Sequence, residues 1–225
     1  MATLTELRDA IDNLLNLPAT SSLLQLNSNT CERAYETYIF SLCVEAVKRA
    51  GGQVTLVGIQ TGNNPSTLVF RGAPGSMASR DQDFCYASCT VGNKDFEIHV
   101  DVEYEGHSSA THEIDVSICD ARHCNSVRVT RRLPKTGKNL IMLFECKFYS
   151  STPGVSLART FVGLRSDCSQ YQLSGFVSNI TTQNLRSYLS KKDRPKPFTT
   201  IPLNSDSEEL FIRNVEQELR RWARV

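Results

Sequence analysis

One stretch of the chain decides the fold: Asn139-Leu140-Ile141-Met142-Leu143-Phe144-Glu145-Cys146-Lys147. Five consecutive apolar residues, 140–144, predict a strand that is buried on both faces, as at the centre of a sheet with helices on each side. Because strand side chains alternate between faces, Glu145 and Lys147 point the same way and Cys146 the opposite way. Charges at the end of such a strand are costly, so we expect them to have a role.

Another acidic residue, Asp115, lies in the earlier strand-like run 112–116. Two carboxylates on neighbouring strands can hold a hard divalent cation such as Mg²⁺, which prefers oxygen ligands. A lysine beside them can orient an attacking water near a phosphodiester. We therefore predict a metal-dependent nuclease site in which Asp115 and Glu145 are the metal ligands and Lys147 orients the water. The alternative interpretation is a structural Glu–Lys pair at a strand end.

The combination of Asp115 with the triplet Glu145-Cys146-Lys147 resembles the PD-(D/E)xK superfamily, the restriction-endonuclease-like nucleases. The resemblance implies an α/β fold with an αβββαβ core, in which helices flank a central mixed sheet. It also implies Mg²⁺ as the cofactor, for which Mn²⁺ can substitute, and DNA rather than RNA as the favoured substrate. The proline that the family places before the first aspartate is absent, because Ile114 precedes Asp115.

Further site residues follow from the same resemblance. Many family members add a glutamate from the first core helix, and Glu36 is the candidate here, with Glu32 as the alternative. Two solvated acids on a helix surface would explain both residues equally well. Arg159, on the helix after the lysine strand, is expected near the substrate phosphate. Arg131 and Arg132 belong to a basic segment that could contact a phosphate backbone, or that is an ordinary solvated loop or helix.

Hydrophobic periodicity and turn residues predict the remaining elements. We expect helices over residues 3–15, 31–50, 156–164, 182–189 and 205–222. We expect strands over residues 67–70, 83–90, 96–104, 113–119 and 171–177.

The run 96–104 alternates apolar and polar residues almost strictly. This pattern predicts a half-buried strand that presents Glu97, His99, Asp101 and Glu103 to solvent. A solvent face explains these acids more simply than a second metal site does.

The length of 225 residues favours one substantial domain. We divide the chain into an N-terminal helix and connector (1–29), the core (30–190), and a basic, proline-containing linker with an amphipathic helix (191–225). The net charge of +1 excludes a strongly basic tail, so nucleic-acid binding would depend on local patches. The sequence shows no signal peptide and no stretch apolar enough to span a bilayer, which predicts a cytoplasmic location without a membrane partner.

The eight cysteines predict buried thiols rather than disulfides in a cytosolic chain. A zinc-binding interaction domain is the alternative, and its candidate ligands are Cys85, Cys89, Cys119, His123 and Cys124. The spacings within this set are too loose for a zinc knuckle.

The function expected from these residues is a Mg²⁺-dependent endodeoxyribonuclease, similar to nuclease components of bacterial restriction or defence systems. The alternative is a nuclease-like fold that serves as a nucleic-acid-binding or assembly module with little catalysis. Cleavage of both strands of a duplex would favour a homodimer. The sequence carries no helicase-like or phosphate-loop signature, so we expect target selection to depend on a partner protein or on the helices outside the core.

Overall fold

A computed structural model describes residues 2–17, 24–26, 31–168, 171–191, 196–199, 201, 203 and 205–225. Over these residues the centre of the molecule is a mixed eight-stranded sheet in the order β10-β9-β8-β7-β6-β5-β2-β3. Its strands are β2 Gln53–Gly58, β3 Gly62–Asn63, β5 Cys85–Val91, β6 Lys94–Glu105, β7 Thr111–Asp120, β8 Leu140–Lys147, β9 Leu173–Ser178 and β10 Lys196–Thr199. Neighbouring strands run antiparallel from β3 to β8, whereas β8, β9 and β10 are parallel to one another. A separate parallel pair is formed by β1 Leu24–Leu26 and β4 Leu68–Phe70.

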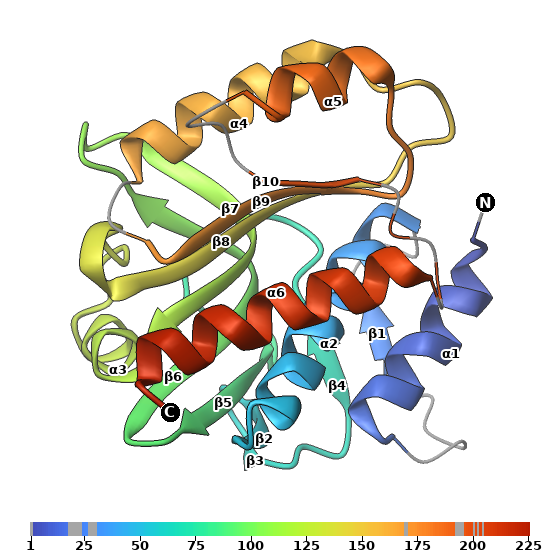
Figure 1. The fold of residues 1–225 in the computed structure, drawn as a ribbon. Coiled ribbons are helices and arrows are strands. Elements are labelled where there is room, and N and C mark those ends of the chain that lie inside the picture. Colours follow the sequence, from blue (N-terminus) through green and yellow to red (C-terminus); the bar gives the residue numbers. More distant parts are fainter. Residues whose placement is uncertain are drawn as a thin grey trace.

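Helices cover both faces of this sheet (Figure 1). One hydrophobic cluster includes buried residues of α1 Leu4–Leu15, α2 Cys31–Arg49 and α6 Asp206–Ala223. The other includes buried residues of α3 Ala121–Thr130, α4 Val155–Asp167 and α5 Gln183–Leu189. A short 3₁₀ helix, η1 Gly137–Asn139, leads into β8. Within the described ranges, no helix combines the length and the apolar character needed to cross a membrane.

The central strand β8 is buried on both faces, as its apolar run predicts. Ile141, Met142 and Phe144 belong to the cluster under α2 and α6, while Leu140 and Leu143 belong to the cluster under α4 and α5. The chain is therefore an α/β protein whose mixed sheet is flanked by helices, which confirms the coarse fold prediction.

Local signals fix several helix ends. The predicted capping box at the start of α1 is present, because Thr3 and Glu6 bond to each other's backbone N–H groups. Ser205 caps α6 by accepting a hydrogen bond from the backbone N–H of Glu208. The apolar face of α6 packs on the core of its own chain, where Phe211 lies 5.1 Å from Phe144 between ring centroids.

The solvent face predicted for β6 is wrong. Glu97, His99 and Asp101 are buried, with 3%, 5% and 0% of their surface exposed. An alternating pattern indicates a solvated face only when nothing covers that face, and here α2 and α3 pack against opposite sides of β6. These three polar residues of β6 therefore belong to the interior.

Three other segments differ from the expectation. The segment predicted as a basic linker includes β10, which pairs in parallel with β9, while residues 192–195 lie outside the described residues. The connector predicted before α2 includes β1, and its residues 18–23 and 27–30 are likewise outside the described residues. The strand β2 was not predicted, and the first part of the basic segment forms α3.

Candidate active site

The end of β8 brings Asp115 to Glu145 and Lys147. Toward the C-terminal end of β8, the last residue pair of the β7–β8 ladder is Val116 with Phe144. Just beyond it, the backbone N–H of Cys146 donates a hydrogen bond of 2.7 Å to Oδ2 of Asp115. On its other side, β8 stays paired with β9 as far as Lys147. The carboxylate of Asp115 thus takes the place of a backbone acceptor where the two strands separate.

Lys147 connects the two acids of the predicted site. Its Nζ lies 3.0 Å from Oδ2 of Asp115 and 2.8 Å from Oε1 of Glu145. Burial acts to lower the pKa of Lys147, but the two carboxylates outweigh it and raise that pKa. Lys147 is therefore an ammonium group at neutral pH, able to donate hydrogen bonds to a water or a phosphate oxygen but not to act as a base.

Helix α2 contributes Glu36, as the resemblance implied. Glu36, Asp101 and Asp115 each offer one carboxylate oxygen, and these three atoms all lie within 4.8 Å of one another. Glu36 is buried, which excludes the interpretation that it is a solvated surface acid. Glu32 lines the opening of the site but is not part of this group.

Asp101 is the site residue that the sequence interpretation missed. It lies on β6 between two residues that pair with Val116 and Ile114, so it is bracketed opposite Asp115. Its φ of 51° is in the left-handed region, which Asp and Asn adopt more readily than most residues. Oδ2 of Asp101 accepts a hydrogen bond from Arg33, whereas buried Oδ1 has no hydrogen-bond partner among the described residues. A buried carboxylate oxygen without a donor is costly, and a bound cation or a shared proton would satisfy it.

Arg33 is an internal counter-ion of the same cluster. Its guanidinium lies 3.1 Å from Oε2 of Glu36 and 3.0 Å from Oδ2 of Asp101. The first turns of α2 place Arg33 and Glu36 on one side of the helix, since they are three residues apart.

The cluster contains more acids than cationic groups. Burial raises the pKa of Glu36, and the neighbouring Asp101 and Asp115 raise it further. Burial also raises the pKa values of Asp101 and Glu145. When all four acids are ionised, Arg33 and Lys147 together balance half of their charge. A divalent cation would supply the remaining two positive charges, so the donor set fits a hard metal ion.

A surface hollow of about 290 Å³ opens onto the cluster. It is lined by Glu32, Arg33, Glu36, Glu113, Cys146, Lys147, Phe148 and Tyr149. A larger hollow of about 680 Å³ lies beside α1 and α2, and its lining includes none of the predicted site residues. Glu36 and Lys147 are therefore reachable from solvent through the smaller hollow.

The other predicted residues lie apart from this hollow. Arg159 is exposed on α4, and Arg131 and Arg132 are exposed just after α3. None of the three is among the described residues that line the hollow. Their predicted contacts with a phosphate backbone would require a substrate that extends over the surface.

The five-residue zinc set is not brought together. Cys85 and Cys89 belong to the cluster under α2, whereas Cys119 and Cys124 belong to the cluster on the opposite face. All eight cysteines are free thiols and seven of them are buried, which confirms the prediction of buried thiols.

No protein-family model, curated protein or solved structure matches the chain. The fold and the site together define an α/β protein with a buried cluster of carboxylates that could hold a metal ion, and a surface hollow reaches this cluster at Glu36.

Proposed function

We propose that this protein is a Mg²⁺-dependent phosphodiesterase of the restriction-endonuclease-like class that cleaves DNA. One observation carries the proposal: at the end of a buried strand, Lys147 lies within ion-pair distance of both Asp115 and Glu145. Glu36 and Asp101 complete an acidic cluster beside them, and one buried oxygen of Asp101 has no hydrogen-bond partner in the part of the chain that the structure describes.

The order of elements supports the finer fold assignment. Helix α2 carries Glu36, the antiparallel strands β6, β7 and β8 carry Asp101, Asp115 and Glu145, and α4 crosses over to the parallel strand β9. This succession is compatible with the αβββαβ core of the nuclease class, with α3 inserted between β7 and β8.

The reaction would be addition of water across a P–O bond of a phosphodiester, giving a phosphate monoester and an alcohol. A Mg²⁺ ion held by Asp115 and Glu145 would supply Lewis acidity at the phosphate oxygens. Lys147, fixed by its two ion pairs, would donate a hydrogen bond to the attacking water or to a phosphate oxygen. Glu36 and Asp101 would hold the positively charged Arg33 in place through their ion pairs with it.

A nucleic-acid-binding or assembly module with little catalysis is the second candidate. The observation that favours it is that Lys147 and Arg33 already pair with the acids of the cluster, so that part of the charge is balanced inside the protein. A partner protein for targeting is part of the proposal in either case. A homodimer that cleaves both strands of a duplex belongs to the first candidate alone.

The test is incubation of wild type and Asp115→Asn with plasmid DNA, single-stranded DNA and RNA, each with Mg²⁺, Mn²⁺ or EDTA. We expect metal-dependent cleavage of DNA by the wild type and loss of cleavage in Asp115→Asn. Asp9→Asn, at an exposed position of α1, is the matched control and should cleave like the wild type. Binding of DNA without cleavage would favour the second candidate, and equal cleavage by both proteins would exclude the proposed site.

A further inference from the structure

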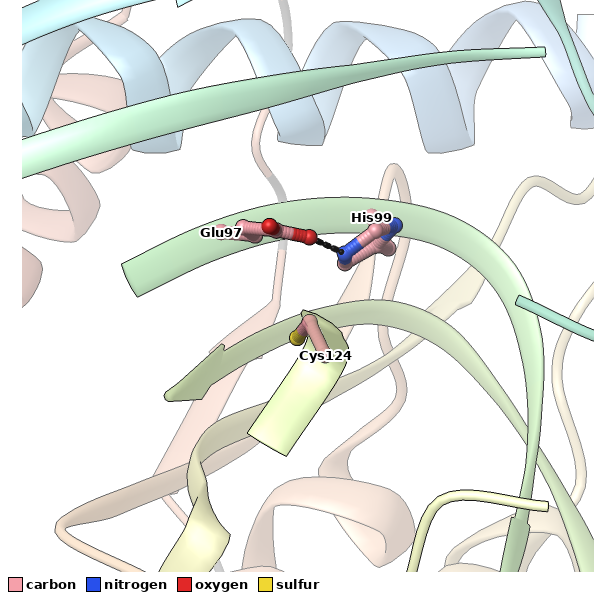
Figure 2. Close-up of side chains that lie close together, drawn as sticks. All are labelled: Glu97, His99 and Cys124. Carbon is pink, nitrogen blue, oxygen red and sulfur yellow. Dashed lines mark hydrogen bonds and ion pairs between the residues drawn. The ribbon is translucent and has the colours of Figure 1, made fainter. Parts of the chain in front are cut away.

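A second group of potential metal ligands lies on β6 and α3. Glu97, His99 and Cys124 each offer one ligand atom, and these atoms all lie within 4.8 Å of one another. Figure 2 shows Glu97 and His99 side by side on β6, with the sulfur of Cys124 below them. Glu97 and His99 share a strand face because they are two residues apart. All three residues are buried.

A fourth ligand is available from β7. Cys119 pairs directly with Glu97 across the β6–β7 ladder, which places their Cβ atoms about 5 Å apart. The side chains of Cys119 and Cys124 are close enough to interact electrostatically. Two strands and one helix thus place two thiols, one imidazole and one carboxylate on the same side of the sheet.

These donor types match zinc rather than magnesium. Thiolate and imidazole are ligands that Zn²⁺ prefers, and four protein ligands are typical of structural zinc sites. Nε2 of His99 lies 2.9 Å from Oε2 of Glu97. In a tetrahedral site with zinc–ligand bonds of about 2.0–2.2 Å, two ligand atoms are separated by only slightly more than the distance between these two atoms. Little movement of these two side chains is needed to admit the ion.

Arg128 is the residue that must be reconciled with a metal ion here. It donates hydrogen bonds to both carboxylate oxygens of Glu97 and lies over the ring of Tyr86 at 4.9 Å. With both thiols ionised, the four ligands carry three negative charges, of which zinc balances two. Arg128 balances the third if it keeps its bond to Oε1 while the metal takes Oε2. Its positive charge therefore complements a two-thiolate site.

We propose that these four side chains form a structural zinc site that fixes α3 to the sheet. Binding of Zn²⁺ would release the two thiol protons to solvent. The site is separate from the Asp115 cluster, so it does not depend on the proposed nuclease activity.

The test is the zinc content of the intact protein, purified under reducing conditions after expression with zinc and measured by mass spectrometry. We expect one zinc per chain in the wild type and a loss of at least tenfold in Cys124→Ser and His99→Gln. Cys31→Ser, at the least buried cysteine, is the matched control and should keep the metal. Asp115→Asn should also keep it, which separates this site from the nuclease site.

Cobalt substitution gives a second readout that does not require the variants to fold. Co²⁺ added to apo wild type should produce thiolate-to-metal charge-transfer bands and tetrahedral d–d bands. A folded wild-type protein that binds neither Zn²⁺ nor Co²⁺ would overturn the proposal, as would zinc retained by a folded Cys124→Ser protein. The cluster would then be an ion-paired network around Arg128.

Discussion

Strand β6 contributes to two buried polar clusters, which differ in their donors, charge and access to solvent. The Asp115 cluster contains Glu36, Asp101 and Asp115, and the Glu97 cluster contains Glu97, His99 and Cys124. The Asp115 cluster has only carboxylate oxygens as metal donors, excess negative charge and an adjoining hollow. The Glu97 cluster combines oxygen, nitrogen and sulfur, is buried, and has Arg128 beside it. The first arrangement suits a hard cation that exchanges waters and substrate, and the second suits a closed structural site. The kind of metal ion that a cluster can bind is thus better inferred from its charge balance and its access to solvent than from its number of ligands.

The largest effect on cleavage is expected from removing the charge of Lys147, and the matching change at Arg128 should not have this effect. Lys147→Met keeps much of the side-chain stem but removes the ammonium group, so we expect cleavage to fall by about 10²–10³-fold. Arg128→Met should leave cleavage within a few-fold of wild type and lower the melting temperature instead, because Glu97 loses its buried partner. Cleavage rates and thermal unfolding of both variants test this contrast. Lys191→Met, at an exposed position, is the control.

Full cleavage by Lys147→Met in the presence of Mg²⁺ would show that the proposed mechanism is wrong. Loss of cleavage in Arg128→Met without loss of stability would show that the two clusters are not separate.

The next effect concerns Asp101. Asp101→Asn keeps a residue that tolerates the left-handed backbone but removes one buried negative charge. We expect the metal-free protein to become more stable and its affinity for Mg²⁺ to fall about tenfold, since like charges of the cluster repel one another until a cation binds. Urea unfolding and calorimetric titration measure the two changes. A loss of stability together with unchanged affinity would indicate a purely structural Asp101.

The two clusters should also respond to pH in opposite directions. The pKa of Glu36 is raised in the folded state, so the folded protein holds a proton that the unfolded chain releases above a pH of about 4.5. Stability of the metal-free protein should therefore fall as pH rises above that value, and Glu36→Gln should flatten the fall. Unfolding by urea at a series of pH values tests this slope.

The pH dependence of stability that is expected from Glu97 has the opposite sign. Burial acts to raise its pKa, but hydrogen bonds from Arg128 and His99 outweigh this and lower the pKa to about 2. Its contribution of about 3 kcal/mol is present above the unfolded pKa of about 4.5 and is lost as pH falls toward 2. Glu97→Gln should therefore be less stable than wild type at pH 6 and similar to it near pH 2. An equal difference at both pH values would contradict the account.

The smallest effect is expected from the exposed arginines. Arg131→Ala and Arg132→Ala should each weaken DNA binding and reduce the slope of log affinity against log salt by about one. Stability should change by less than about 0.5 kcal/mol, because both side chains are exposed. Fluorescence anisotropy over a salt series measures the slope. Arg80→Ala, exposed elsewhere on the surface, is the control. Identical slopes for all variants would show that Arg131 and Arg132 do not contact the DNA.

The sequence predicts the part of the site that is local in the chain. Glu145 and Lys147 are two residues apart on an apolar strand, so their common direction follows from strand geometry alone. Asp115 and Glu36 could not be assigned from strand geometry alone, because nothing in one sequence states which strands and helices are neighbours. The structure brings all four together.

Asp101 and the Glu97 cluster could not be predicted in this way. The alternation along β6 is the same whether its polar face meets solvent or another helix, and α3 was not identified as a helix that covers it. The signal that was present is the spacing of Glu97, His99 and Asp101 at every second position, together with Cys119 and Cys124 nearby in the sequence. Only the observed burial distinguishes an interior polar cluster from a wet surface.

The most direct test of the central claim is calorimetric titration of Mg²⁺ into the wild-type protein and into Asp115→Asn at neutral pH. The account predicts saturable binding to the wild type and its loss in Asp115→Asn, with both proteins folded. Equal binding by the two proteins, or no binding to the folded wild type, would contradict the assignment of the buried carboxylates as a magnesium site.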